Sequence, residues 1–184
     1  IQGNGDSSSP DISGDGFYTC FNSTASNLDV GDTNGAADIF VAHRVTGGIA
    51  RISISTFGGE ADKSSLSPSI SQFGNLIAYY SYATNLVPGD MNAEIDIFVR
   101  DLATGTTERA SVAYDGSEAN DLSLLGVISS SGQHVVYSSM ATNLVPGGTN
   151  SGVWHSYQFD RYTGLVQHLS RNSNGQEGNG HSWT

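Results

Sequence analysis

Two short acidic loops contain the residues of this chain that are best suited to chemistry. The first loop offers Asp32, Asn34 and Asp38 at its positions 1, 3 and 7. The second repeats these residue types and this spacing at Asp90, Asn92 and Asp96. Side-chain oxygens at such positions of a tight turn can converge on one point, and nearby backbone carbonyls can complete the shell. Hard oxygen donors in a flexible loop suit Ca²⁺, so both loops are predicted calcium sites.

A different interpretation of the same loops stays open. Asp and Asn side chains often accept a hydrogen bond from the backbone two residues on, which caps a turn and needs no metal. The loops are not EF-hands, because the bidentate Glu at position 12 and the flanking helices are missing. In a third copy, Gly148 replaces the first aspartate and His155 falls near the last one after a one-residue insertion. We expect no calcium there.

Three glutamates recur at the ends of these copies, namely Glu60, Glu118 and Glu177. One hypothesis is an acidic ring that lines one face and binds cations or sugars. The other, which we favour, is that each glutamate accepts hydrogen bonds from backbone N–H groups of the adjacent repeat and so fixes its packing.

No catalytic residues and no organic cofactor site are predicted. The histidines fall at different phases of the repeat and form no zinc or dyad spacing. Cys20 aligns with small apolar residues of the other copies, so we expect it in the core. Trp154, His155, Tyr157 and Tyr162 cluster in the third copy, where they either stack on sugar rings or fill the gap left by a missing metal.

These loops belong to a tandem repeat of about 58 residues. The pair Asn27-Leu28 returns as Asn85-Leu86 and as Asn143-Leu144, and both steps are 58 residues. Each copy holds short apolar runs separated by Gly, Asp, Asn and Ser, which indicates an all-β protein. In the second copy we predict four strands, over 67–71, 76–81, 96–101 and 107–113. Four antiparallel strands per repeat are typical of a β-propeller blade.

The second copy also carries three blocks that identify a family resemblance. They are Ser-Pro-x-Ile-Ser from residue 67, Asn-Leu-Val-Pro-Gly-Asp-x-Asn from residue 85, and Asp-Ile-Phe-Val-Arg-Asp-Leu-Ala-Thr-Gly-Thr-Thr from residue 96. These blocks resemble the TolB-type, WD-repeat-like propeller repeats of bacterial exported proteins. The resemblance implies β-propeller blades, and similar loops in related repeats look like calcium sites.

The repeat divides the chain into blade 1 (1–61), blade 2 (62–119) and blade 3 (120–178). Residues 179–184 are predicted to begin a further blade or to supply a closing strand. Three blades cannot close a ring, since propellers have about four to eight. We therefore expect either a part of a longer propeller or a half that pairs with a second copy, and exposed blade edges that need a partner.

Composition limits the partners and the location. The formal charge of −11, with one lysine (Lys63), disfavours nucleic acid and anionic membrane surfaces. No segment is apolar enough for membrane insertion. Because the chain starts at Ile1 without a visible signal peptide, we expect a processing boundary there. The acidic, lysine-poor composition is typical of secreted or cell-surface proteins of bacterial type.

We therefore predict a non-enzymatic, calcium-binding extracellular scaffold that engages a protein partner or a second copy through its blade edges. The alternative is a propeller that binds or cleaves carbohydrate, such as a lectin, a polysaccharide lyase or a glycosidase.

Overall fold

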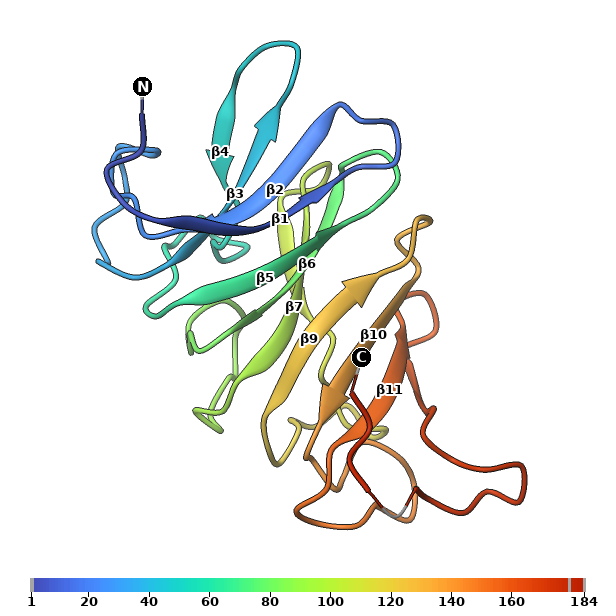
Figure 1. Cartoon of the computed structure of the whole chain (residues 1–184). Coiled ribbons are helices and arrows are strands. Elements are labelled where there is room, and N and C mark those ends of the chain that lie inside the picture. Colours follow the sequence, from blue (N-terminus) through green and yellow to red (C-terminus); the bar gives the residue numbers. More distant parts are fainter. Residues whose placement is uncertain (1, 179, 184) are drawn as a thin grey trace.

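The computed structural model describes residues 2–178 and 180–183, which form three antiparallel sheets of four strands each and no helix (Figure 1). The sheet of blade 1 contains β1 (Ser7–Ile12), β2 (Tyr18–Ser23), β3 (Asp38–His43) and β4 (Ile49–Arg51). The sheet of blade 2 contains β5 (Ser65–Ile70), β6 (Leu76–Ser81), β7 (Asp96–Asp101) and β8 (Thr106–Arg109). The sheet of blade 3 contains β9 (Ser123–Ile128), β10 (His134–Ser139), β11 (His155–Asp160) and β12 (Leu165–His168).

The predicted strands of blade 2 agree closely with the observed ones. β6 and β7 have the predicted bounds, and β6 is buried along nearly its whole length, as its apolar run indicated. β5 begins two residues earlier than predicted. β8 ends at Arg109, four residues earlier than predicted, and beyond it Val112 makes only an isolated bridge to Glu118.

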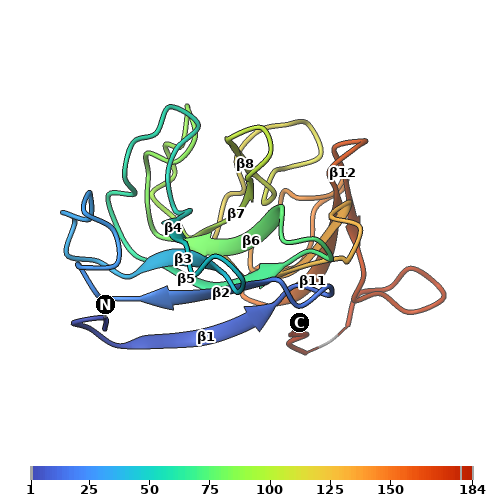
Figure 2. The ribbon, with the colours of Figure 1, turned by 90° about the horizontal axis from the view of Figure 1, so that it is seen from above.

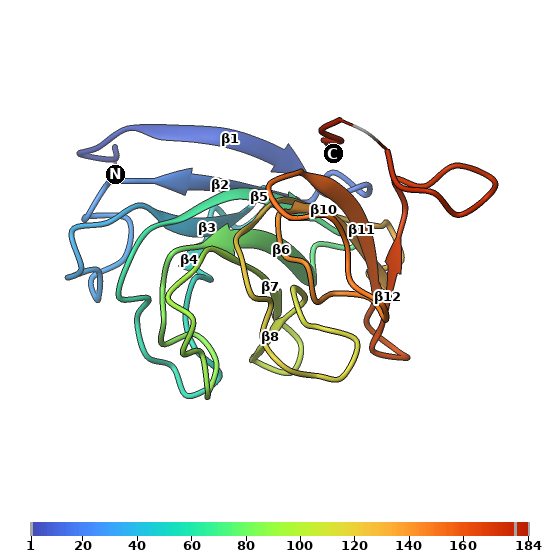
Figure 3. The same cartoon turned by 90° about the horizontal axis from the view of Figure 1, so that it is seen from below.

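The three sheets lie side by side in chain order, with their first strands close together (Figures 2 and 3). The turns that follow these first strands are hydrogen-bonded from blade to blade. The backbone N–H of Asp15 donates to the carbonyl of Gln72 at 3.1 Å, and that of Gln72 donates to Ser130 at 3.0 Å. The arrangement confirms an all-β partial propeller of three blades.

Apolar side chains of successive sheets form the core between blades. Between blades 1 and 2, Cys20 and Ile39 pack in one cluster with Ile77 and Tyr79. Cys20 is fully buried, as predicted, and burial raises the pKa of its thiol to about 12. Such a thiol carries no appreciable thiolate at neutral pH, so it acts as a small apolar side chain.

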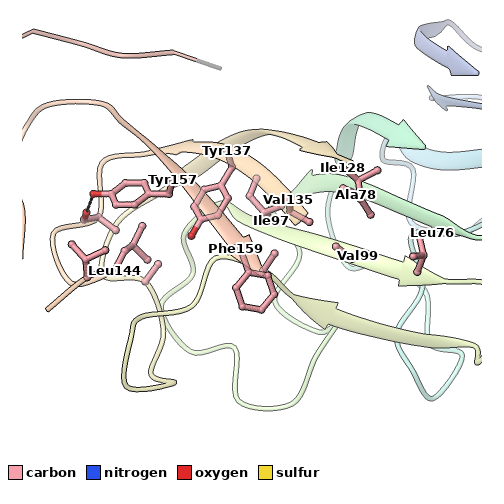
Figure 4. Close-up of a cluster of buried hydrophobic side chains, with 14 residues drawn as sticks. Leu76, Ala78, Ile97, Val99, Ile128, Val135, Tyr137, Leu144, Tyr157 and Phe159 are labelled. Carbon is pink, nitrogen blue, oxygen red and sulfur yellow. Dashed lines mark hydrogen bonds between the residues drawn. The ribbon is translucent and has the colours of Figure 1, made fainter. Parts of the chain in front are cut away.

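A second cluster joins blades 2 and 3 (Figure 4). Ala78 and Ile97 of blade 2 pack with Val135 and Tyr137 of blade 3. Nearby, the fully buried Tyr157 directs its hydroxyl toward the carbonyl of Ala141, at 3.4 Å. Blade 2 therefore contributes a different set of side chains to each of its two neighbours.

The recurring Asn-Leu pair has a structural explanation. The Asn143 side chain accepts a hydrogen bond from the Asn120 N–H at 3.0 Å and donates one to the Glu118 carbonyl at 2.8 Å. Asn85 makes the same two bonds, with Asp62 and Glu60. The side-chain amide thus bonds to one backbone N–H and one backbone C=O of the segment that enters each blade, as the backbone of a neighbouring strand would.

We expect Asn143→Ala to destabilise the chain by about 2 kcal/mol, because two hydrogen bonds are lost and a backbone N–H and C=O lose their partners. Urea unfolding of the variant and the native chain measures the difference. Asn174→Ala serves as the control, since its exposed side chain lies in a turn near the C-terminus. Equal losses in both variants would contradict the structural role of Asn143.

Candidate cation sites

The predicted ligands of blade 1 come from different parts of its sheet. Asp32 and Asn34 lie in the loop between β2 and β3, and Asp38 is the first residue of β3. The fold adds two residues that were not among the predicted ligands. Arg51, the last residue of β4, and Glu60, in the segment that leaves the blade, reach the same point.

Three carboxylates converge there. One oxygen each of Asp32, Asp38 and Glu60 lies within 4.8 Å of the other two. The guanidinium of Arg51 lies among them, paired with Glu60, while its Nη1 is 3.5 Å from Asp38 Oδ2 and 3.8 Å from Asp32 Oδ1. Its Nε lies 3.2 Å from a fourth carboxylate, that of Asp29, so one guanidinium faces four carboxylates.

The Asp32 carboxylate is the least satisfied of the three. Both of its oxygens are buried, and neither accepts a hydrogen bond from any described residue. Asp38, by contrast, accepts a hydrogen bond from the Ser53 hydroxyl at 2.5 Å and one from the Asn34 amide at 3.0 Å. Burying a carboxylate without hydrogen bonds costs free energy, and a cation bound to Asp32 would offset that cost.

Asn34 has the role that the turn interpretation described. Its Oδ1 accepts a hydrogen bond from the Ala36 N–H at 2.7 Å, and its Nδ2 donates to the Ala61 carbonyl at 3.0 Å. Asn92 makes the equivalent bonds, to Glu94 and Ala119, at 3.0 Å each. Both asparagines therefore shape their loops and orient the neighbouring carboxylates.

Blade 2 repeats the residue types and the ion pairs of this site, but its carboxylates are less tightly grouped, since among the described residues only those of blade 1 lie within 4.8 Å of one another. Arg109 Nη1 is 2.7 Å from Glu118, 3.5 Å from Asp96 and 3.6 Å from Asp90. Both Asp90 oxygens are buried and accept no hydrogen bond from a described residue, as in Asp32. Because both copies have the same residue types and ion pairs, the arrangement is a property of the repeat and not an accident of one loop.

The pKa values reflect the crowding of charge. Burial, and then the nearby Asp96, raise the pKa of Asp90 to about 6. Burial also raises the pKa of Asp32, Asp38 and Asp96. Burial acts in the same direction on Glu118, but hydrogen bonds from Met91 N–H and Arg109 outweigh it and leave that pKa below its usual range.

In the absence of metal, this predicts an unusual dependence of stability on pH. An Asp whose pKa is higher in the folded than in the unfolded state stabilises the fold as it takes up a proton. The free energy of unfolding should therefore rise by about 1 kcal/mol between pH 7 and pH 5 through Asp90. Urea unfolding in a chelator measures it. The same slope in Asp90→Asn would contradict the assignment to Asp90.

The loop of blade 2 also contains a strained residue. Ala93 has a φ of 57°, and glycines occupy the corresponding turns of blades 1 and 3, where Gly35 and Gly152 have φ of 65° and 72°. We expect Ala93→Gly to stabilise the chain by about 1 kcal/mol, because a Cβ is disfavoured in the left-handed region. Thermal melting checks it. Ala103→Gly, in an exposed turn without positive φ, is the control and should not stabilise.

The recurring glutamates bind backbone N–H groups, but not those of the adjacent blade. Glu60 accepts a hydrogen bond from the N–H of Thr33 at 2.9 Å, within its own blade. Glu118 does the same with Met91 at 2.9 Å. The prediction was right about the type of bond and wrong about the blade, because each glutamate turns back over the loop between the second and third strands. The two arginines were missed, although their exact recurrence, Arg51 and then Arg109 after 58 residues, is a sequence signal that could have identified them.

Blade 3 departs from this pattern as its sequence indicated. Gly148 provides no carboxylate, and His155, the first residue of β11, occupies the place of Asp38 and Asp96. His155 is fully buried, with its Nε2 3.8 Å from Glu177 Oε2. The structure thus brings together two residues that sequence spacing did not connect.

The aromatic cluster predicted in blade 3 is not one platform. His155 and Tyr157 are fully buried, and Tyr162 lies in the turn at the other end of β11. Trp154 instead packs against Trp183, with ring centroids 4.7 Å apart and ring planes tilted by 34°. Trp154 directly precedes β11 and points away from the face of its neighbour His155, because successive residues of an extended chain point to opposite sides, whereas Tyr162 is separated by the length of the strand.

Ser170 and His168 lie close together, but the hydrogen bond between them does not run in the direction that a nucleophile and its general base require. His168 Nε2 is 2.9 Å from the Ser170 hydroxyl, but Arg171 Nε–H donates to His168 Nδ1 at 2.7 Å. The neutral ring then carries its proton on Nε2, so it cannot accept the proton of the serine. Burial also lowers the pKa of His168 to about 4.

Comparison with known proteins places the fold. No protein-family model and no curated protein matches the chain. Among solved structures, TolB from Acinetobacter baumannii superposes with a TM-score of 0.56 at 16% identity, over 96% of this chain and 35% of that one. A TolB-type protein from Agrobacterium tumefaciens gives a TM-score of 0.52 at 19% identity, over 85% and 46%. The β-propeller domain of the Trilobed protease from Pyrococcus furiosus gives 0.53 at 13% identity, over 92% and 43%.

These similarities confirm the predicted TolB-type propeller resemblance at the level of the fold. The chain spans between about a third and a half of the length of these three solved chains. Within the part of the chain that the structure describes, no helix is long and apolar enough to cross a membrane.

Proposed function

We propose that this chain is part of a non-enzymatic β-propeller scaffold of the bacterial cell exterior, secreted or at the cell surface, which binds Ca²⁺ in blades 1 and 2. In each blade two aspartates and a glutamate supply the ligands: Asp32, Asp38 and Glu60, and then Asp90, Asp96 and Glu118. The extracellular location follows from the acidic, lysine-poor composition, with a formal charge of −11.

The observation that carries the proposal is the pair of unsatisfied buried carboxylates. Asp32 and Asp90 occupy the same place in two blades, and each faces two further carboxylates with one arginine among them. Each site therefore has a deficit of positive charge and of donors. A hard divalent cation with oxygen ligands removes both deficits, and Ca²⁺ tolerates the irregular geometry of a loop.

Asn34 and Asn92, predicted as ligands, have a positioning role in this proposal. Their side-chain oxygens already accept backbone hydrogen bonds, and their amide nitrogens face the carbonyls of Ala61 and Ala119. Rotation of either amide toward the ion would break the turn that holds the aspartates together.

Calorimetric titration of the metal-stripped chain with Ca²⁺ tests the proposal, with thermal melting followed in Ca²⁺ and in EDTA. We expect two sites per chain and a higher melting temperature in Ca²⁺. The absence of both a heat of binding and a shift in melting temperature would overturn the proposal. The loops would then be hydrogen-bonded turns with an arginine as their counter-ion.

We also propose that the open faces of the terminal blades bind a partner protein or a second copy. Ile12 of blade 1 is 58% exposed, whereas its counterpart Ile70 is 7% exposed beneath blade 1. On the open face of blade 3, the polar residues Gln158 and Ser156 take the positions that the apolar Val99 and Ile97 have in blade 2. The open face of blade 1 is apolar and the open face of blade 3 is polar. A partner protein with a small, apolar sheet face therefore fits blade 1 better than blade 3 of a second copy would. Light scattering across a range of concentrations shows whether the chain associates with itself.

A carbohydrate-binding propeller is a second candidate, favoured by the contact between the rings of Trp154 and Trp183. Trp183 is 57% exposed, and His181 packs beside it with ring centroids 6.1 Å apart. Exposed aromatic faces next to polar groups can stack on sugar rings. A glycan array with the native chain and with Trp183→Ala tests this, and an absence of hits with the native chain would exclude it.

A further inference from the structure

The outer strand of blade 3 has a free edge. β12 ends the sheet of its blade, because only β11 pairs with it (Figures 2 and 3). Hydrogen-bonded and non-hydrogen-bonded pairs alternate in an antiparallel ladder, and the bond from the Leu169 N–H to the Ser156 carbonyl fixes the alternation here. The N–H and C=O groups of Val166 and His168 therefore point outward, and none of them is hydrogen-bonded to a described residue.

The corresponding edge of blade 2 is closed by a residue of blade 1. Thr107 of β8 occupies the place of Val166, since each forms the second pair after its hairpin turn. The Thr107 N–H donates to the hydroxyl of Thr56 at 2.9 Å, and that hydroxyl donates to the Thr107 carbonyl at 3.2 Å. One group that both accepts and donates therefore satisfies the backbone at this position, which shows the chemistry that the edge requires.

Blade 2 provides no such cap for blade 3. The counterpart of Thr56, 58 residues further along the chain, is Tyr114, which is 56% exposed. In place of a hydrogen bond, the edge of β12 borders a groove with a volume of about 780 Å³. The lining of the groove combines β12 and its flanking turns with three residues of other segments, namely Tyr114, Val145 and Pro146.

An extended peptide fits this edge and its groove. Outward N–H and C=O groups recur at every second residue of β12, and a neighbouring strand presents its own groups at the same spacing. β12 has the sequence Leu-Val-Gln-His, without the Lys or Pro that commonly protects an exposed edge. Val145, Pro146 and Val166 beside the edge offer apolar contacts to a side chain of the added strand.

We propose that β12 binds an extended segment of a partner protein as an additional strand of blade 3, with an apolar side chain of that segment in the groove beside Tyr114. Backbone hydrogen bonds supply the affinity in this mode of recognition, and the groove selects the side chain. The proposal does not depend on calcium binding or on the open faces of the terminal blades, because it uses the edge of a sheet and none of the cation ligands.

An array of short synthetic peptides Thr-X-Thr-Z-Thr, with X and Z varied over all amino acids, tests the proposal on the full chain. We expect binding where X or Z is large and apolar, and the bound peptide should protect the Val166 and His168 amides from hydrogen exchange. Val166→Pro should weaken binding by about tenfold, because it removes an outward N–H and no bond to β11. Tyr114→Thr should weaken it similarly, since a threonine at this place can cap the edge as Thr56 does.

Tyr162→Thr is the matched control and should bind as the native chain does, because Tyr162 is 73% exposed in the turn before β12 and lies outside the lining of the groove. No binding of any peptide, or undiminished binding in Val166→Pro and Tyr114→Thr, would overturn the proposal. Protection of the Val166 amide that grows with protein concentration in the absence of peptide would also overturn it, because a second copy would then fill the edge. Binding of the free amino acid Z as tightly as the peptide would do the same, by assigning the groove to a small molecule.

Discussion

Replacing one carboxylate of blade 2 by an amide, in Asp90→Asn, should lower the number of Ca²⁺ ions bound per chain from two to one. A site filled at a hundredfold excess of calcium over its Kd stabilises the fold by about 2.7 kcal/mol, and the variant should lose that amount in Ca²⁺. Calorimetry and urea unfolding in Ca²⁺ measure both quantities.

In EDTA, where no calcium is bound, Asp90→Asn should raise the free energy of unfolding or leave it unchanged. Asp90 is buried without a hydrogen bond and shares its site with Asp96 and Glu118. A neutral side chain of the same shape removes repulsion and the cost of a buried charge. The variant should therefore be at least as stable as the native chain without calcium, and this change of sign distinguishes a metal site from a structural ion pair.

Glu94→Gln is the control for this experiment, because Glu94 lies in the same loop but outside the carboxylate cluster. It should keep both sites. If Asp90→Asn destabilises the chain equally in Ca²⁺ and in EDTA, the carboxylate serves the pairing with Arg109 and the calcium proposal fails for blade 2.

Truncation of a buried leucine between blades, in Leu144→Ala, should destabilise the chain by about 2–5 kcal/mol. Leu144 is fully buried in the cluster that joins blades 2 and 3 (Figure 4). The loss combines the transfer of its methyl groups to water with a cavity that rigid strands on both sides cannot fill. Urea unfolding provides the measurement.

The repeat itself offers a matched control in Leu28→Ala. Leu28 has the same place in blade 1, but it is only half-buried because no blade covers that face in this chain. Its truncation should cost about 1 kcal/mol, close to the transfer free energy of the exposed part. Similar losses for Leu28 and Leu144 would mean that a second molecule covers blade 1 in solution, and the difference should reappear on dilution.

Much of this fold is determined locally by the sequence. The apolar runs of β6 and β7 set their bounds, and the turns between strands carry the Gly and Asp residues that such turns need. The 58-residue period then places every strand and the two acidic loops in register. Strand patterns are visible in sequence because they depend on neighbours a few residues away, and the repeat is visible because the same residue types return at a fixed interval.

The composition of the cation sites was decided by tertiary structure. Arg51 reaches the loop of Asp32 only because β4 pairs with β3, and Glu60 reaches it only because the segment leaving the blade folds back. The same return brings Glu177 to His155 across 22 residues. Spacing in sequence carries no record of such contacts, since they depend on strand pairing and on the path of a loop. The sequence therefore determined where acidic loops occur, and the fold decided which carboxylates, arginines and histidines face one another there.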